Sequence, residues 1–228
     1  MTDTAKQTEE HPIIFNSWSI RRIIAGEKTQ TRRVVKPQPP ENTDEMEVAE
    51  AGSCGYHDDS GHAIYGETCP YGQPGDVLWV REVFRLPGGM EDYSPTEYLE
   101  ETRGGEGVMA PICRYEADGS FSRGPELEMA READSWGRKR PSIHMPHELC
   151  RLRLRVKDVR VERVQELSPG DAAAEGIKRR PKMNYSGEVV GEMNPVGGFK
   201  KLWNDIHGDG AWGENPWVWV LEFLQIDK

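Results

Sequence analysis

Gly26-Glu27-Lys28-Thr29-Gln30-Thr31-Arg32-Arg33 lies between a predicted amphipathic helix and a proline-rich break. Gly26 suits the left-handed position that ends a helix, so Lys28 and Thr31 are expected in a short turn that holds an amine near a hydroxyl. A lysine can take the proton of such a hydroxyl if burial or nearby cations lower its pKa, and the two arginines of the stretch could supply those cations. The same residues also fit a solvated basic turn, because cations next to a helix C-terminus interact favourably with the helix dipole.

The helix before this stretch is predicted to begin at Asn16 or Ser17, because either side chain can cap a helix N-terminus. Three isoleucines are predicted to share one face of it: Ile20, Ile23 and Ile24. Residues 1–10 are expected to form a disordered tail and His11–Phe15 a first strand. After the stretch, the prolines of Lys36–Pro40 end regular structure, because proline has no amide hydrogen to donate to a sheet.

The composition favours a single soluble domain. The chain has 228 residues, 36% of them hydrophobic, which suffices for one core. No apolar run approaches the ~20 residues that span a bilayer, and the N-terminus is polar, so we expect a cytoplasmic protein without membrane contacts. The formal net charge of −10 argues against tight binding of long nucleic acid, which depends on neutralising phosphates. Local basic stretches are compatible with weak RNA binding.

The four cysteines include no Cys-x-x-Cys pair, so neither a disulfide framework nor a standard zinc site is indicated. They are Cys54, Cys69, Cys113 and Cys150. Cys54 and His57, with His62 and Cys69 nearby, could bind zinc, although the glycine-rich segment reads more simply as a loop. We expect no metal and no cofactor.

A strand is predicted over Val77–Phe84, after a segment dense in turn formers. Its side chains alternate between two faces, which places Trp79 and Arg81 together and Glu82 on the opposite face. An indole beside a guanidinium suits a flat nucleobase, through stacking and hydrogen bonding. Equally, Trp79 could fill a core while Arg81 pairs with a carboxylate.

Three insertions are predicted, at about residues 37–66, 87–140 and 178–197. Residues 41–66 are acidic and glycine-rich and are expected to be irregular, and residues 178–197 could form a mobile flap. Within 87–140, only Ile112–Ala117 and Leu127–Ala133 look regular. His144 follows between two prolines as a candidate substrate contact or proton carrier, or as a hydrogen-bonded structural histidine.

Alternating apolar residues predict a strand over residues 151–157, and a change of phase at Lys157-Asp158 suggests a bulge. Ser168-Pro169 predicts the start of a short helix that Gly176 ends, which places Glu175 in the last turn. A carboxylate there opposes the helix dipole, and the placement is easier to explain if a cation such as Lys28 faces it. An ordinary exposed glutamate is the alternative.

The C-terminal part is predicted to contain a helix and a closing strand. The helix ends at Gly208 and has four apolar residues on one face: Phe199, Leu202, Trp203 and Ile206. The strand Trp217–Phe223 has apolar side chains on both of its faces, which is typical of a central strand.

Four separated motifs resemble the ASCH domain family, and especially the small bacterial amidohydrolases that remove the acetyl group from N4-acetylcytidine. They are Gly26-x-Lys28-Thr29-x-Thr31-Arg32, Gly75-Asp76-Val77-Leu78-Trp79-Val80, Ala174-Glu175-Gly176-Ile177 and Trp217-Val218-Trp219-Val220-Leu221-Glu222-Phe223. The resemblance covers about half of the chain. It implies an α+β fold built on a PUA-like mixed β-barrel, with a few short helices and long loop insertions.

The resemblance also implies a catalytic set of Lys28, Thr31 and Glu175. Thr31 would attack the acyl carbonyl, Lys28 would accept and return its proton, and Glu175 would orient Lys28 or protonate the leaving amine. This chemistry needs no metal or organic cofactor, and its partner would be a small nucleoside substrate. Six further residues are candidate substrate contacts: Arg32, Arg33, Trp79, Arg81, Glu82 and His144.

Other functions are compatible with the same fold, because fold alone does not fix function. One is a non-catalytic module that binds RNA or a modified base, and another is a ribonuclease with the same lysine-centred pocket. A third is an accessory or morphogenetic protein of a phage, since longer proteins resembling this chain occur in prophages.

Overall fold

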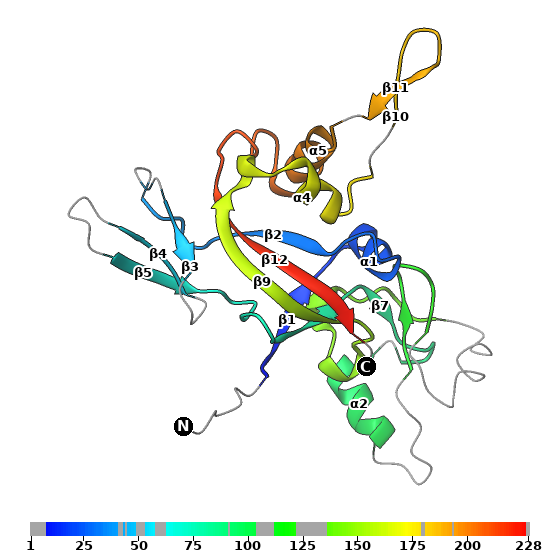
Figure 1. Ribbon diagram of the computed structural model, residues 1–228. Coiled ribbons are helices and arrows are strands. Elements are labelled where there is room, and N and C mark those ends of the chain that lie inside the picture. Colours follow the sequence, from blue (N-terminus) through cyan, green and yellow to red (C-terminus); the bar gives the residue numbers. More distant parts are fainter. Residues whose placement is uncertain are drawn as a thin grey trace. The chain divides into compact units, whose positions relative to one another are not determined.

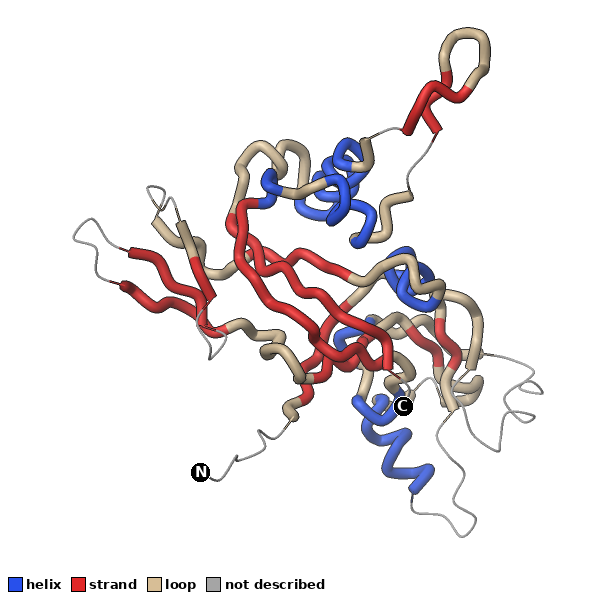
Figure 2. Tube along the Cα trace, viewed as in Figure 1, coloured by secondary structure: helices blue, strands red, loops and turns tan. Residues whose placement is uncertain are grey.

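The computed structural model describes residues 8–40, 43, 45–48, 53–57, 63–90, 92–103, 112–121, 136–178, 181–192 and 194–226. The fold is α+β, as predicted. Five strands form one mixed sheet in the order β1-β6-β9-β12-β2, and the helices are few and short (Figures 1 and 2). The chain divides into two compact units. The organisation as a single domain with insertions stays a prediction.

Unit 1 comprises Met1–Glu9, Ala25–Asp76 and Arg155–Leu224, and it contains the stretch from Gly26 to Arg33. Its elements are β2 (Gln30–Val34), β3 (Glu47–Val48), β4 (Ser53–His57), β5 (Ala63–Thr68), β9 (Arg153–Arg163), the 3₁₀ helix η3 (Val164–Glu166), α4 (Pro169–Ala174), β10 (Pro181–Met183), β11 (Val189–Glu192), α5 (Val196–His207) and β12 (Trp217–Ile226). The first two residues of β9 and the last two of β12 belong to unit 2.

The core of unit 1 lies on one face of the β2–β12 pair. These strands are antiparallel, with Val218 opposite Val34 and Val220 opposite Arg32. Opposed residues share a face of the sheet, so Val34, Val218 and Val220 lie together. They pack with Phe199 and Trp203 of α5 and with Ala172 of α4. β12 lies between β9 and β2, as its apolar sequence predicts.

The prediction that residues 41–66 are irregular is wrong. β3, β4 and β5 form a three-stranded antiparallel sheet there. The sequence holds a hairpin signal that its acidic and glycine-rich composition obscures. Residues 53–57 and 63–68 each contain an aromatic residue, and the turn formers Asp58-Asp59-Ser60-Gly61 lie between them.

The remainder of unit 1 follows its sequence patterns closely. In β9, Lys157 and Asp158 are both exposed between the buried Val156 and Val159, so the predicted change of phase is confirmed. Residues 178–197 include a hairpin formed by β10 and β11. Helix α5 ends before Gly208, as predicted. Of the four residues predicted on one face, Phe199 and Trp203 are buried, whereas Ile206 near the end of the helix is 55% exposed.

Unit 2 comprises Glu10–Ile24, Val77–Leu154 and Gln225–Lys228. Its elements are β1 (Glu10–Ile14), α1 (Ser17–Ile24), β6 (Val77–Arg81), β7 (Phe84–Arg85), α2 (Pro95–Arg103), β8 (Arg114–Tyr115) and the 3₁₀ helices η1 (Ser142–His144) and η2 (His147–Leu149). β1 and β6 pair in parallel, and β7 and β8 pair antiparallel. One core cluster joins the second half of the unit: Phe84, Leu86, Tyr98, Leu99, Cys113, Tyr115, Met145 and Leu149.

The first helix matches its prediction except at one residue. Asn16 caps α1, since its side-chain oxygen accepts a hydrogen bond from the Ser19 amide at 2.8 Å. Ile20 and Ile23 are buried, whereas Ile24 is 42% exposed. The buried face of the helix therefore includes two of the three predicted isoleucines. No helix within the described ranges has the length and apolar character needed to cross a membrane.

Helix α2 lies in the 87–140 insertion, where no helix at this position was predicted. Ser94 and Glu97 form a reciprocal capping box around its first turn, with the Ser94 amide donating to Glu97 at 2.7 Å and the Glu97 amide donating to Ser94 at 3.2 Å. Pro95 occupies the first helical position. This is the same signal that identified the helix after Ser168. The predicted regular segment Leu127–Ala133 lies outside the described residues.

Candidate functional site

A buried ion pair joins the two motifs that sequence reasoning assigned to one site. The Lys28 amine lies 2.5 Å from Glu175 Oε2, and the two side chains are 3% and 4% exposed. Lys28 also donates a hydrogen bond to the backbone carbonyl of Glu175 at 3.1 Å. Residues that are 147 positions apart in the sequence therefore meet in unit 1. The cation that faces Glu175 is Lys28, as the position of this carboxylate predicted.

Local backbone chemistry explains this meeting. Gly26 has φ 69°, the predicted left-handed residue, and it redirects the chain toward β2. On the other side, Ser168 accepts a hydrogen bond from the Asp171 amide and starts α4, with Glu175 as its C-terminal cap. The Thr29 amide donates to the carbonyl of Ala174 at 2.8 Å, which links the two segments directly. α4 also packs against β2 and α5, and Figure 1 shows α4 beside α5.

The surroundings of Lys28 shift its pKa downward from the ordinary value of a lysine. Burial lowers the pKa of Lys28, because an ammonium loses its hydration there. The carboxylate of Glu175 opposes this effect, while the charges of Arg33 and then Arg32 add to it. The net direction is downward. The two arginines are thus the cations that the sequence suggested.

Arg32 lies at the centre of an internal network. Its side chain is fully buried and contacts residues of three elements. Nη1 donates to Gln30 Oε1 at 2.6 Å and lies 3.4 Å from Glu175 Oε1. Nη2 donates to Glu162 and lies 3.7 Å from Asp171 Oδ2. Arg32 was predicted as a substrate contact, and the structure shows its guanidinium engaged with protein groups.

A second arginine extends the network. Arg160 of β9 donates to Glu162 Oε2 at 3.2 Å, to Asp171 Oδ1 at 3.0 Å and to Glu222 Oε1 at 2.7 Å. Gln30 donates to the same oxygens of Asp171 and Glu222. Sequence reasoning missed these network residues. Arg160 and Glu162 lie two residues apart on β9 and so point to the same face of the strand. Nothing in the sequence indicates on which face α4 packs.

Thr31 was expected in a turn, and it lies instead in β2, opposite Leu221. The side chain is buried, and strand alternation directs it away from the face that bears Gln30 and Arg32. Arg33 shares the face of Thr31 and lowers the pKa of Lys28 more strongly than Arg32 does. Burial lowers the pKa of Arg33 itself, against the opposing effects of Tyr71 and Glu175.

Trp79 and Arg81 lie on one face of β6 in unit 2, as predicted. The Arg81 guanidinium carbon is 5.4 Å from the centre of the Trp79 ring, and Arg81 Nη2 donates to the carbonyl of Ile143. The rings of Trp79 and His147 form a T-shaped pair, with 5.2 Å between ring centres. Both side chains are half-buried, and the printed hydrogen bond of Arg81 goes to a backbone carbonyl and not to a carboxylate. The roles of Trp79 and Arg81 as substrate contacts stay predictions.

Glu82 is a buried carboxylate in an ion pair. Arg151 donates to both of its oxygens, from Nε at 2.7 Å and from Nη2 at 2.8 Å. Burial raises the pKa of Glu82, and the hydrogen bonds and charge of Arg151 oppose this. Arg151 also stacks on Tyr115, at 4.1 Å from the ring centre. This carboxylate has a structural partner, and its role as a substrate contact stays a prediction.

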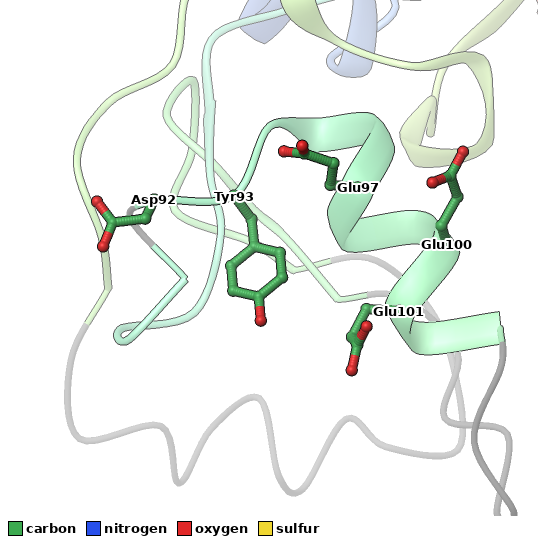
Figure 3. Close-up of a pocket in the computed structure, with 5 residues that line it drawn as sticks. All are labelled: Asp92, Tyr93, Glu97, Glu100 and Glu101. Carbon is green, nitrogen blue, oxygen red and sulfur yellow. The ribbon is translucent and has the colours of Figure 1, made fainter.

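His144 is exposed in η1 and lines a cavity of about 470 Å³ together with Tyr93, Arg138 and Arg140. A cavity of about 500 Å³ shares Asp92, Tyr93 and Glu97 with it and is also lined by Glu100 and Glu101. Figure 3 shows the Tyr93 ring beside the first turns of α2, which bears the three glutamates. All residues that line these cavities belong to unit 2.

The cysteine segment gives little support to a zinc site. Cys54 and Cys69 are both buried, and burial raises the pKa of Cys69 to about 11, which disfavours the thiolate that binds a metal. Among the side chains that the structure describes, no group of three or more His, Cys, Asp or Glu residues could hold a metal ion. The side chains of His57 and His62 are not among them.

No protein-family model, curated protein or solved structure matches this chain.

Proposed function

We propose that the protein is an amidohydrolase that removes the acyl group from N4-acylated cytosine nucleosides, with Lys28, Thr31 and Glu175 as the catalytic set. The observation that supports it is the buried contact between Lys28 and Glu175, at 2.5 Å. A lowered pKa makes the neutral amine of a buried lysine easier to form, which suits a general base. In the same proposal, the five-stranded mixed sheet is part of a PUA-like barrel of the ASCH type.

The proposed reaction transfers the acyl group through an ester. Lys28 accepts the proton of the Thr31 hydroxyl while the oxygen attacks the acyl carbonyl carbon. The C–N bond then breaks as the exocyclic amine of the cytosine takes the proton from Lys28. Water hydrolyses the acyl-threonine, again with Lys28 as the base, and releases the carboxylic acid. Glu175 orients the amine of Lys28 throughout.

The three residues enter this proposal with different support. Lys28 and Glu175 enter through their contact and burial. Thr31 enters through its spacing from Lys28, its burial and the resemblance to the amidohydrolases. An alternative without a covalent step is attack by a water molecule that Lys28 activates.

The test is incubation of the purified protein with N4-acetylcytidine and a panel of N4-acyl analogues, followed by the shift of the ultraviolet spectrum to that of cytidine. Lys28→Ala is expected to lower turnover by ~10²–10⁴-fold, because a positioned base is lost. Lys201→Ala is the matched control, since Lys201 is an exposed lysine of α5, 79% exposed. Near-normal turnover of Lys28→Ala would exclude Lys28 from the mechanism.

Variants of Thr31 separate the two routes. Thr31→Ser retains a hydroxyl and is expected to keep activity, whereas Thr31→Val is expected to lose it. Equal activity in both variants would indicate attack by water. Absence of hydrolysis for every acylcytidine, combined with tight RNA binding at physiological salt, would favour the non-catalytic binding module.

A further inference from the structure

We propose that Arg32 is a positioning residue for the Lys28–Glu175 pair, because it holds one oxygen of Glu175 and thereby fixes the other on the Lys28 amine. The two oxygens of this carboxylate have different partners. Oε2 contacts Lys28 at 2.5 Å, and Oε1 lies 3.4 Å from Nη1 of Arg32. A terminal carboxylate turns easily about its last bond, and a cation on the second oxygen restricts that rotation.

Arg32 is itself fixed from several sides. Its side chain is fully buried, and its donors reach Gln30 on β2, Glu162 on β9 and Asp171 on α4. A guanidinium presents its donors in a rigid plane, so it can bridge these groups and Glu175 at once. Lysine has a single nitrogen and cannot make the same set of contacts. The arrangement suits a group that holds another side chain in place.

The charges around Lys28 give this role a measurable consequence. Glu175 faces the amine directly, and Arg33 and Arg32 contribute positive charge. Behind Arg32 lie the carboxylates of Glu162 and Asp171, which Arg160 also contacts. Loss of the positive charge of Arg32 would favour the ammonium of Lys28. Loss of the negative charge of Glu162 would disfavour it.

These opposite signs define the experiment, which needs no substrate. The pKa of Lys28 is measured from the pH titration of the ¹³C resonance of its ε-methylene, assigned with Lys28→Met, in protein labelled at lysine. Arg32→Gln is expected to raise this pKa by roughly one unit, since it removes a like charge close to the ammonium. Glu162→Gln is expected to lower it. The resonance of the exposed Lys201 serves as the control and is expected to stay unchanged.

The result that overturns the proposal is an unchanged titration of Lys28 in folded Arg32→Gln, or shifts of the same sign in both variants. If Arg32→Gln does not fold, Glu162→Gln decides alone, because it keeps the buried guanidinium. A lower pKa of Lys28 then supports the proposal, and an unchanged one refutes it. Arg32→Lys separates positioning from charge, because it keeps the positive charge and loses the fork that holds Glu175 Oε1. It is expected to lower the pKa of Lys28, since Glu175 raises that pKa only while it faces the amine, and an unchanged pKa in folded Arg32→Lys would also overturn the proposal.

The effect on catalysis rests on the proposed hydrolase function, and the two can fail separately. If the protein hydrolyses an acylcytidine, the acidic limb of the pH–rate profile is expected to move with the pKa of Lys28 in each variant. Shifts in the titration without any hydrolysis would leave Arg32 as a positioning residue and remove the proposed function. Hydrolysis of an acylcytidine together with an unchanged titration of Lys28 would support the proposed function and remove Arg32 as a positioning residue.

Discussion

The ion pair between Lys28 and Glu175 predicts a strong energetic coupling between two residues from distant parts of the sequence. The perturbation is a double-mutant cycle on the free energy of unfolding, with Lys28→Met, Glu175→Gln and the combination of both. Each single variant leaves one buried charge without its main partner, whereas the double variant leaves neither. The double variant is therefore expected to be more stable than the sum of the single losses predicts.

The burial of both groups sets the magnitude. Breaking a buried pair by removing one partner costs about 3–5 kcal/mol. In Lys28→Met the loss is expected at the lower end of this range, because Arg32 still lies 3.4 Å from Glu175. In Glu175→Gln the loss of stability cannot exceed about 4–5 kcal/mol. At that point Lys28 would instead release its proton, because deprotonating a lysine of ordinary pKa at pH 7 costs about the same free energy. We expect a coupling energy of about 2–3 kcal/mol.

Urea denaturation at pH 7 measures all four proteins, with equal m-values as the condition for comparing them. The control cycle uses Lys201 and Asp205, which form an exposed pair at 3.2 Å one turn apart on α5. Its coupling is expected below about 0.5 kcal/mol. Additivity within about 0.5 kcal/mol at Lys28 and Glu175 would refute the reasoning, because it would mean that the two charges do not interact in solution.

Three further predictions follow from the same structure. Hydrogen bonds from Ser168 and Gln30 outweigh the effect of burial and hold the pKa of Asp171 at about 2, below its ordinary 3.8. Wild-type protein should therefore lose on the order of 2 kcal/mol of stability as the pH falls from 4 to 2, and urea denaturation should show a smaller loss for Asp171→Asn. Gly176 has φ 92°, so Gly176→Ala should lower the free energy of unfolding by ~1–2 kcal/mol. In Gly197→Ala the added methyl group meets open space in helix α5, and the same assay should show a free energy of unfolding about 0.5–1 kcal/mol higher. Fluorescence anisotropy should show only weak, salt-sensitive binding to generic RNA and duplex DNA, because the net charge is −10, and affinity that persists at high salt would contradict this.

The features that could be predicted from the sequence are those fixed by a few neighbouring residues. Asn16 caps α1, Gly26 takes the left-handed conformation, and Ser168 starts α4. Each depends on local backbone geometry that only certain residues supply. That Lys28 faces Glu175 was one of two interpretations of the sequence, because a nearby cation offsets the unfavourable dipole at a helix C-terminus, and an exposed glutamate was the other.

The features that could not be predicted depend on pairing between distant segments. Arg160 and Glu162 alternate with apolar residues as any half-buried strand does, and only the fold places them under α4. Thr31 was expected in a turn because Gly26 ends the helix before it, and its strand partner Leu221 lies 190 residues further along the chain, where local sequence gives no sign of the pairing. Helix α2 is a different case, since Ser94-Pro95-Thr96-Glu97 carries the capping signal and its polar surroundings obscured it.

The position of Arg32 bears on where a proton from Lys28 can go in the proposed reaction. The Lys28 amine lies 2.5 Å from Glu175 Oε2, so the simplest acceptor of its proton is Glu175. That transfer would leave a neutral amine beside a neutral carboxylic acid. A cation on the other oxygen disfavours that transfer, because it favours the charged form of a carboxylate. The charge of Arg32 also disfavours the ammonium of Lys28. Both effects act against leaving the proton within the pair. They favour a Lys28 that accepts the hydroxyl proton only briefly and passes it to the leaving amine, which is the proton path that hydrolysis of an acylcytidine requires.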